Sequence, residues 1–443
     1  MTPSNTLTTA PVLPTLLRLS APNLLAMLAT AMVSVAETAY VGQLGTPALA
    51  GMALVFPLVM LQQMLSAGSV GGAISANISR AVGRGDTAAA EALAWHACVL
   101  ALALGLGFTL LLAVGATAVL GLLGGQDQAL AQGVAYAHVA FGASVSIWLI
   151  NTFASICRAS GDMVTPSFTL LSVAAAQVLL GGSLGLGWLG TPPLGMAGVA
   201  AGLALASSAG ALFLLWRLTR VEARVRLRWQ GQVQWQHLGP IVRVGGVASL
   251  SSIQTVLTIL IVTRLVAHWG SEALAGYGIG TRLEFMLIPI TFAVGVACVP
   301  LVGMALGAGL VARARQVAWT GATVVGAVLG VAGVVAAIWP NAWSSLFSDH
   351  AAVLDAAHSY FRHVAPFYGL FGVGLCLYFA SQGAGKLVGP VLAGTLRLVM
   401  VAAGGWWLVA HQGGLADVYM LIGAGMAVYG LATVWAVWRT RWA

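Results

Sequence analysis

The sequence predicts an all-α integral membrane protein with twelve transmembrane helices in two six-helix lobes. Two observations on composition and one on repetition support this fold class. Of the 443 residues, 59% are hydrophobic and only 7% are charged, whereas soluble proteins have roughly 25% charged residues. The apolar runs have the length of membrane-spanning helices rather than the short alternating pattern of barrel strands. The third observation is an internal repeat, which divides the helices into the two lobes.

Runs of apolar residues long enough to span a bilayer as helices follow one another along the whole chain. The expected spans lie near residues 17–41, 48–74, 93–123, 133–157, 165–189, 195–218, 238–268, 275–306, 317–340, 357–382, 388–411 and 415–438. The connections between these runs are too short to hold a soluble domain.

The basic residues gather on one side of these spans. Of the 19 Lys and Arg, 15 lie near the N-terminus, in or beside the loops after the even-numbered runs, or at the C-terminus. Opposite loops such as QLGTP and HQGGLAD contain none, although Arg362 begins the tenth run. Basic loops remain in the cytoplasm, so we predict a multi-pass protein of the cell inner membrane with both termini cytoplasmic. The net charge of +8 therefore reports orientation, and we expect no nucleic-acid partner.

An internal repeat relates the two halves of the chain. Gly45 and Ala48–Gly51 match Gly270 and Ala273–Gly276 at an offset of 225, and Gly161 and Pro166 match Gly385 and Pro390 at 224. Each repeat holds six spans, an even number, so both lobes have the same topology, related by a pseudo-two-fold axis along the membrane normal with a cavity between them. We predict an N-terminal lobe over 1–220, a cytoplasmic connector over 221–237 and a C-terminal lobe over 238–443. This organisation indicates a transporter.

Two acidic residues, Glu37 and Glu284, lie inside apolar runs. An ionised carboxylate in hydrocarbon costs at least about 2.5–3.5 kcal/mol. Burial disfavours the charged form, so such a group can hold a proton near neutral pH and release it when wetted, as proton coupling requires. The alternatives are an interfacial position for Glu37 and, for Glu284, a structural pairing across helices with Arg264 or Arg397.

Polar, aromatic and methionine side chains also occur within the predicted spans, and they are candidates for lining a substrate cavity. These candidates are Gln62, Met64, Asn151, Gln177, Gln254, Tyr277, Phe285 and Tyr378. Hydrogen bonding between helices explains the amides equally well, and core or lipid-facing packing explains the other side chains. Pro22 interrupts the hydrogen bonding of the first helix, and we expect a bend there.

No pattern of an enzyme site occurs in the sequence. There is no glycine-rich nucleotide loop of the Walker type, and the four cysteines are scattered in or beside apolar runs without metal-ligand spacing. We therefore expect a protein that is not an enzyme, with no cofactor, no metal site and buried free cysteines.

Several collinear motifs resemble the MATE (multidrug and toxic compound extrusion) family. The segment AETAYVGQLGTPALAG (36–51) is similar to the first-helix signature, usually an Asp-Thr pair followed by V-G-x-L-G, with Glu37 at the Asp position and Pro22 at the upstream proline. RAVGRGD (80–86) resembles the basic loop after the second helix. CRASGDMVTP (157–166) and its copy SQGAGKLVGP (381–390) resemble the R-x-x-G-D-x-x-x-P element, and residues 278–309 resemble the eighth helix of bacterial members.

The resemblance implies an antiporter in which entry of H⁺, or alternatively Na⁺, drives export of small amphipathic, often cationic molecules. The DinF-like branch, the nearer one, places Asn and Asp four residues apart on the fifth helix, where this chain has Gln177 and Gly181. The NorM-like branch uses acids on the seventh and tenth helices, whereas here the seventh offers Gln254 and 357–382 contains no acid. We therefore predict protonation at Glu37, with Glu284 as a second or substrate-facing acid.

Two other functions remain as alternatives. Relatives in the same superfamily flip lipid-linked intermediates, but they have extra spans and cation-rich cavities, whereas this chain offers only Arg264, Arg282, Arg362 and Arg397 in spans or on the outer side. A membrane enzyme or receptor is disfavoured by the missing catalytic cluster and by the repeat. We expect a monomer whose partners are the lipid bilayer and small amphipathic molecules.

Overall fold

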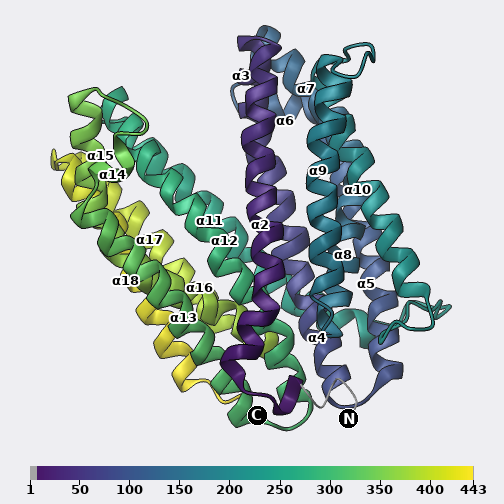
Figure 1. Ribbon diagram of the computed structural model, residues 1–443. Coiled ribbons are helices and arrows are strands. Elements are labelled where there is room, and N and C mark those ends of the chain that lie inside the picture. The colour runs from purple at the N-terminus through teal and green to yellow at the C-terminus, as the bar shows by residue number, and fades with distance from the viewer. Residues whose placement is uncertain (1–6, 443) are drawn as a thin grey trace. The chain divides into compact units, whose positions relative to one another are not determined.

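Helices form almost the whole of the described chain. The computed structural model describes residues 7–442, within which no strand occurs (Figure 1). Eleven of the helices found there are long and apolar enough to cross a membrane. A twelfth span is counted if two helices that meet at a bend of 47°, over 127–159, form one crossing, and these helices coincide with the predicted span at 133–157. The predicted helical membrane fold is confirmed.

Packing divides the chain into two compact units. The N-unit comprises residues 21–245, and the C-unit comprises residues 1–20 together with 246–443. The N-unit contains most of α2 (Val12–Gln43), followed by α3 (Thr46–Gln63), the π-helical η1 (Met64–Val70), α4 (Gly71–Gly83), α5 (Thr87–Phe108), the π-helical η2 (Thr109–Val114), α6 (Ala116–Leu122), α7 (Asp127–Gly142), α8 (Ser144–Ala159), α9 (Val164–Leu186), α10 (Gly195–Thr219) and the start of α11 (Trp235–Ala267).

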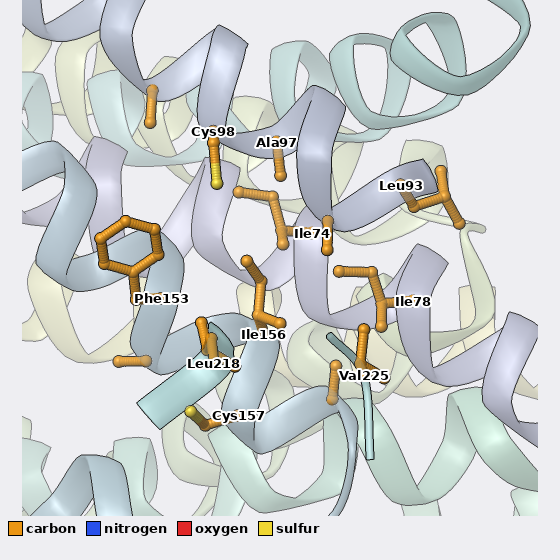
Figure 2. Packing of buried hydrophobic residues seen from close by; sticks show 14 of the residues in the cluster. Ile74, Ile78, Leu93, Ala97, Cys98, Phe153, Ile156, Cys157, Leu218 and Val225 are labelled. Carbon is orange, nitrogen blue, oxygen red and sulfur yellow. The ribbon is translucent and has the colours of Figure 1, made fainter. Parts of the chain in front are cut away.

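A buried core holds the N-unit together. Figure 2 shows Ile74 and Ile78 of α4 beside Leu93 and Cys98 of α5, with Ile156 of α8 in the same cluster. Many of its other members are alanines. Because lipid is as apolar as leucine, such helices associate through close packing, which small residues allow. The four cysteines of the chain are free and buried, as predicted.

The C-unit is also built from long helices, but these are interrupted at other positions than in the N-unit. It contains the rest of α11, then α12 (Ser271–Gly307), α13 (Val311–Ile338), α14 (Asn341–Ser344), α15 (Ala351–Val364), the 3₁₀ turn η3 (Ala365–Phe367), α16 (Tyr368–Ala384), α17 (Val388–Ala410) and α18 (Leu415–Arg439). The turn η3 includes Pro366, which has no N–H to donate to the preceding turn. The predicted tenth span is therefore built from two helical pieces, α15 and α16.

Two long helices belong partly to each unit. The first turns of α2 pack in the C-unit, where Leu16 is fully buried and the guanidinium of Arg313 donates to the carbonyls of Leu7 and Ala10 at 2.8 and 2.6 Å. The start of α11 packs in the N-unit, where Asn77 Nδ2 donates to the carbonyl of Pro240 at 3.4 Å. The two crossing points, 20/21 and 245/246, are 225 residues apart, which is the offset of the sequence repeat.

The segment between α10 and α11 is fastened to the N-unit. The amide of Leu227 donates to the carbonyl of Leu218 at 3.1 Å, Arg228 pairs with Glu91 at 3.7 Å, and the amide of Gln234 donates to His96 Nε2 at 2.8 Å. The predicted lobe boundaries count membrane spans, whereas the two units follow packing, so those boundaries stay a prediction.

Candidate functional site

Glu37 lies on α2 within the N-unit and is almost completely buried. Its side chain is 5% exposed. Gln177, on α9, donates from Nε2 to Glu37 Oε1 at 2.7 Å. Neither of the two ion pairs found among residues 7–442 involves Glu37, so its carboxylate is held by an amide dipole rather than by a basic side chain.

Two tyrosines complete the surroundings of Glu37. Tyr40 lies three residues further along α2 and is 2% exposed, and Tyr136 approaches from α7, also fully buried. Both interact electrostatically with the Glu37 carboxyl. The Tyr40 hydroxyl makes no well-aligned hydrogen bond within the described chain, although it lies within hydrogen-bonding reach of the Glu37 carboxyl. The Tyr40 ring meets the ring of Trp188 edge-on at 5.7 Å between centroids.

Glycines on α9 and α10 allow this close approach. A Cβ added at Gly181 would lie 2.7 Å from the Tyr40 hydroxyl. One added at Gly202 of α10 would lie 2.3 Å from the Gly181 amide nitrogen and 3.0 Å from the Gln177 carbonyl. The part of α9 that carries Gln177 and Gly181 therefore packs closely against both α2 and α10.

A second polar cluster surrounds the π-helical segment η1. Asn151 of α8, 5% exposed, donates from Nδ2 to Ser66 Oγ at 2.9 Å and to Gln63 Oε1 at 3.2 Å. Gln62 is buried, and its Nε2 has no partner among the residues described. Met64 opens the π-helical turn. Such turns within α-helices occur frequently at functional sites.

Glu284 occupies a different environment in the C-unit. It lies on α12, half-buried, and accepts a hydrogen bond from the Tyr360 hydroxyl. Arg397 of α17 and Tyr368 of α16 interact with it electrostatically. Arg397 is one of the two cations expected as its partner, and the other, Arg264, lies exposed on α11. A cavity of about 20 Å³ adjoins Glu284 and Tyr368, which is room for about one water molecule.

The other predicted cavity residues of the C-unit are placed separately. Gln254 donates from Nε2 to Thr395 Oγ1 at 2.8 Å. Tyr378 is buried and donates to the Ala248 carbonyl at 3.4 Å. Tyr277 is buried edge-on against Tyr360 at 5.7 Å between centroids, whereas Phe285 is 46% exposed. Of these, Tyr277 also interacts electrostatically with Glu284.

The predicted site residues are thus divided between the two units, and each unit has one acid with tyrosines around it. Glu37, Gln62, Met64, Asn151, Gln177 and Pro22 belong to the N-unit, and Glu284, Gln254, Tyr277, Phe285 and Tyr378 belong to the C-unit. Pro22 lies inside α2, which remains helical from Val12 to Gln43. Within residues 7–442, no group of three or more His, Cys, Asp or Glu side chains could hold a metal ion.

Sequence reasoning missed several members of these clusters. Tyr40 could have been found from its spacing, because residues three apart share a helix face. Tyr136, Tyr360 and Tyr368 come from other helices, and no spacing in the sequence connects them with either acid. A pocket of about 320 Å³ lined by Asp162, Arg217, Glu222 and Arg224, among others, was also missed, because the packing of the 220–234 segment creates it.

Comparison with known proteins finds one family over both halves of the chain. The MatE family model matches residues 22–181 and 248–407. A FAD transporter of Shewanella oneidensis is 24% identical over 89% of this chain and 87% of its own length. The protein named probable multidrug resistance protein YoeA, from Bacillus subtilis, is 24% identical over 79% of this chain and 76% of its own length.

Solved structures share the fold. A MOP superfamily transporter from Pyrococcus furiosus superposes with a TM-score of 0.90 at 22% identity, covering 99% of this chain and 98% of that one. The family model covers both halves separately, so the repeat in the sequence corresponds to a repeated family domain.

Proposed function

Because this chain belongs to the MatE family of membrane transporters, we propose that it is a secondary active antiporter that exports small amphipathic molecules in exchange for protons. The expected cargo is cationic drugs or toxic metabolites, which the multidrug name of one relative supports. We place the protein in a bacterial inner membrane with both termini in the cytoplasm, on the distribution of its basic residues. We further propose that it acts as a monomer.

The environment of Glu37 is the observation that carries the choice of ion. Glu37 is 5% exposed, and its carboxylate accepts one amide hydrogen bond and has no basic partner within 4.0 Å among residues 7–442. A buried acid of this kind is stabilised in its neutral, protonated form. A metal ion requires several oxygen ligands, whereas the described surroundings offer one carboxylate, two tyrosine hydroxyls and the Gln177 amide. These features favour H⁺ over Na⁺.

The proposed cycle couples the charge of Glu37 to the accessibility of the substrate site. In the outward-open state Glu37 takes a proton from outside, its burial becomes less costly, and substrate is released. Each positive charge that enters along the membrane potential contributes about 2.3 kcal/mol per 100 mV. Substrate binding from the cytoplasm then accompanies release of the proton inward, so that proton and substrate are bound in alternation.

The remaining predicted residues have supporting roles in this proposal. Gln62, Met64 and Asn151 line the substrate path in the N-unit, and Gln254, Tyr277, Phe285 and Tyr378 line it in the C-unit. Glu284 is the second acid, and the charge of Arg397 favours a substrate-facing role over a proton-binding one. Pro22 provides the flexible point of α2.

Dye transport in proteoliposomes tests the function. Ethidium transport by the purified protein is measured under an imposed pH gradient and, separately, under a Na⁺ gradient. We expect transport under the pH gradient and its loss in Glu37→Gln, because glutamine cannot bind and release a proton. Glu272→Gln, an exposed acid in the first turn of α12, is the matched control and should transport normally.

Other outcomes identify the alternatives. Full pH-driven transport by Glu37→Gln would contradict the proposed role of Glu37 in coupling. Transport that is driven by the Na⁺ gradient but not by the pH gradient would contradict H⁺ as the coupling ion. A parallel arm with FAD in place of ethidium tests the cargo suggested by the Shewanella relative. Movement of a labelled lipid between leaflets without ethidium transport would favour a flippase.

A further inference from the structure

The hydroxyl of Tyr40 is a buried polar group beside Glu37 that the proposed cycle has not used. Tyr40 follows Glu37 by three residues, so both side chains lie on the same face of α2. The residue is 2% exposed. Its hydroxyl makes no well-aligned hydrogen bond within the described chain, but it lies within hydrogen-bonding reach of the Glu37 carboxyl. A buried hydroxyl without a good partner is costly, so we expect the Tyr40 hydroxyl to bond to the Glu37 carboxyl next to it.

The facing surface of α9 is shaped to receive this hydroxyl. Gln177 and Gly181 are four residues apart and share a face of α9. Gln177 reaches Glu37, and Gly181 lies opposite Tyr40, where a Cβ would be 2.7 Å from the hydroxyl oxygen. The next nearest atoms to that Cβ, the Val199 carbonyl oxygen and Tyr40 Cζ, are at 3.4 and 3.5 Å. Only the hydroxyl therefore requires glycine at position 181.

We propose that Tyr40 is a positioning residue for Glu37, whose hydroxyl donates to the ionised carboxylate and accepts from the protonated carboxyl. The proposal rests on the proposed role of Glu37 in coupling and adds a partner that serves both of its protonation states. Gly181 keeps the space in which the hydroxyl turns between these two roles.

The chemistry of the surrounding groups supports this assignment. A tyrosine hydroxyl is both a donor and an acceptor, whereas the Nε2 of Gln177 only donates. The groups facing Glu37 are Tyr40 on its own helix, Tyr136 from α7 and Gln177 from α9. None of these is a cation, so burial and hydrogen bonds rather than an opposite charge set how readily Glu37 takes a proton.

Infrared titration of the full-length protein in liposomes measures the protonation of the Glu37 carboxyl directly, without any substrate. The carbonyl band of the protonated Glu37 carboxyl is followed from acid to alkaline pH and identified by its loss in Glu37→Gln. We expect Tyr40→Phe to move the midpoint upward by about one pH unit, because donation to a charged acceptor is the stronger of the two bonds. The band should also move to higher frequency as the protonated carboxyl loses its acceptor.

Substitution at position 181 separates the hydroxyl from the bulk of the ring. Gly181→Ala leaves Tyr40 unchanged but displaces its hydroxyl, so the midpoint should rise as it does in Tyr40→Phe. In the double variant Tyr40→Phe/Gly181→Ala the added methyl meets no hydroxyl, and no further rise is expected. Gly107→Ala, where a Cβ meets nothing within 4 Å, and Tyr419→Phe, a buried tyrosine of the C-unit, are the controls.

Two results would overturn the proposal. One is an unchanged midpoint and band frequency in Tyr40→Phe. The other is that Gly181→Ala raises the titration midpoint of Glu37 equally in the Tyr40 protein and in the Tyr40→Phe variant. The effect would then come from the bulk of the added methyl group and not from the hydroxyl. Failure of the coupling role of Glu37 gives a different pattern, in which the infrared midpoints shift as expected but Glu37→Gln still transports ethidium.

Discussion

At the scale of single residues, the two intramembrane acids differ in the groups that face them. Glu37 has an amide and two tyrosines around it, whereas Glu284 has the Tyr360 hydroxyl and the guanidinium of Arg397. A nearby cation stabilises the ionised form of an acid, and its absence in a buried place favours the neutral form. This contrast is why the proposed coupling role goes to Glu37.

The Arg397 partnership predicts that Glu284 is needed for stability. Arg397 is half-buried, and its Nε has no hydrogen-bond partner within the described chain. Glu284→Gln removes the negative charge that interacts electrostatically with Arg397, and we expect a loss of about 1–3 kcal/mol in the free energy of unfolding. Thermal unfolding in detergent measures it, with the exposed Glu272→Gln as the control. The double variant Glu284→Gln/Arg397→Gln should recover part of the loss, and no recovery would show that the pair is not coupled.

The sequence predicted the acids but only part of their surroundings. A carboxylate inside an apolar run is conspicuous because of its cost in hydrocarbon, and alignment to the family motifs placed Gln177 on the helix that contacts Glu37. Arg397 was one of two candidates for Glu284. The tyrosines from α7, α15 and α16 could not be predicted, because contacts between distant helices depend on helix rotation, which a uniformly apolar sequence does not encode.

At the scale of helices, the position of α9 depends on glycines rather than on large side chains. Gly202 of α10 lies so close to α9 that a Cβ there would be 2.3 Å from the Gly181 amide nitrogen. Small residues at helix interfaces let backbones approach in this way. Gly202 therefore allows the part of α9 that carries Gln177 and Gly181 to lie directly against α10.

Gly202→Ala is predicted to disturb both stability and the site. Because the methyl meets backbone atoms that cannot move aside alone, we expect a loss of about 1–3 kcal/mol together with weaker ethidium transport. Gly107→Ala on α5 has open space around the added methyl and should be neutral. Thermal unfolding and transport of both variants make the comparison, and equal behaviour of the two would contradict the close packing of α9 and α10.

At the scale of the whole molecule, the two units exchange helical ends. The number and the approximate bounds of the spans followed from apolar runs, and the 225-residue repeat was visible in the sequence. The exchange was not visible in the sequence, because α2 is one continuous helix from Val12 to Gln43 and nothing in its sequence marks residue 20 as a boundary. The end of one helix thus completes a unit formed mainly from the other half of the chain.

This exchange predicts how the protein behaves when it is cut. Residues 1–230 and 231–443 expressed alone should each be unstable, because the first fragment lacks residues 235–245 and the second lacks residues 12–20 of their respective units. Co-expression should restore a complex that an affinity tag on one fragment recovers whole. Stable, monodisperse fragments purified separately would contradict the exchanged ends.

The contact between Arg313 and the first residues of the chain also has a consequence for synthesis. Its partners, the carbonyls of Leu7 and Ala10, precede it by 306 and 303 residues. At about 5–20 residues per second, the ribosome needs roughly 15–60 seconds to supply the arginine after the carbonyls have emerged. The segment at Leu7 and Ala10 therefore lacks this contact until most of the polypeptide has been made, and the C-unit cannot be completed before then.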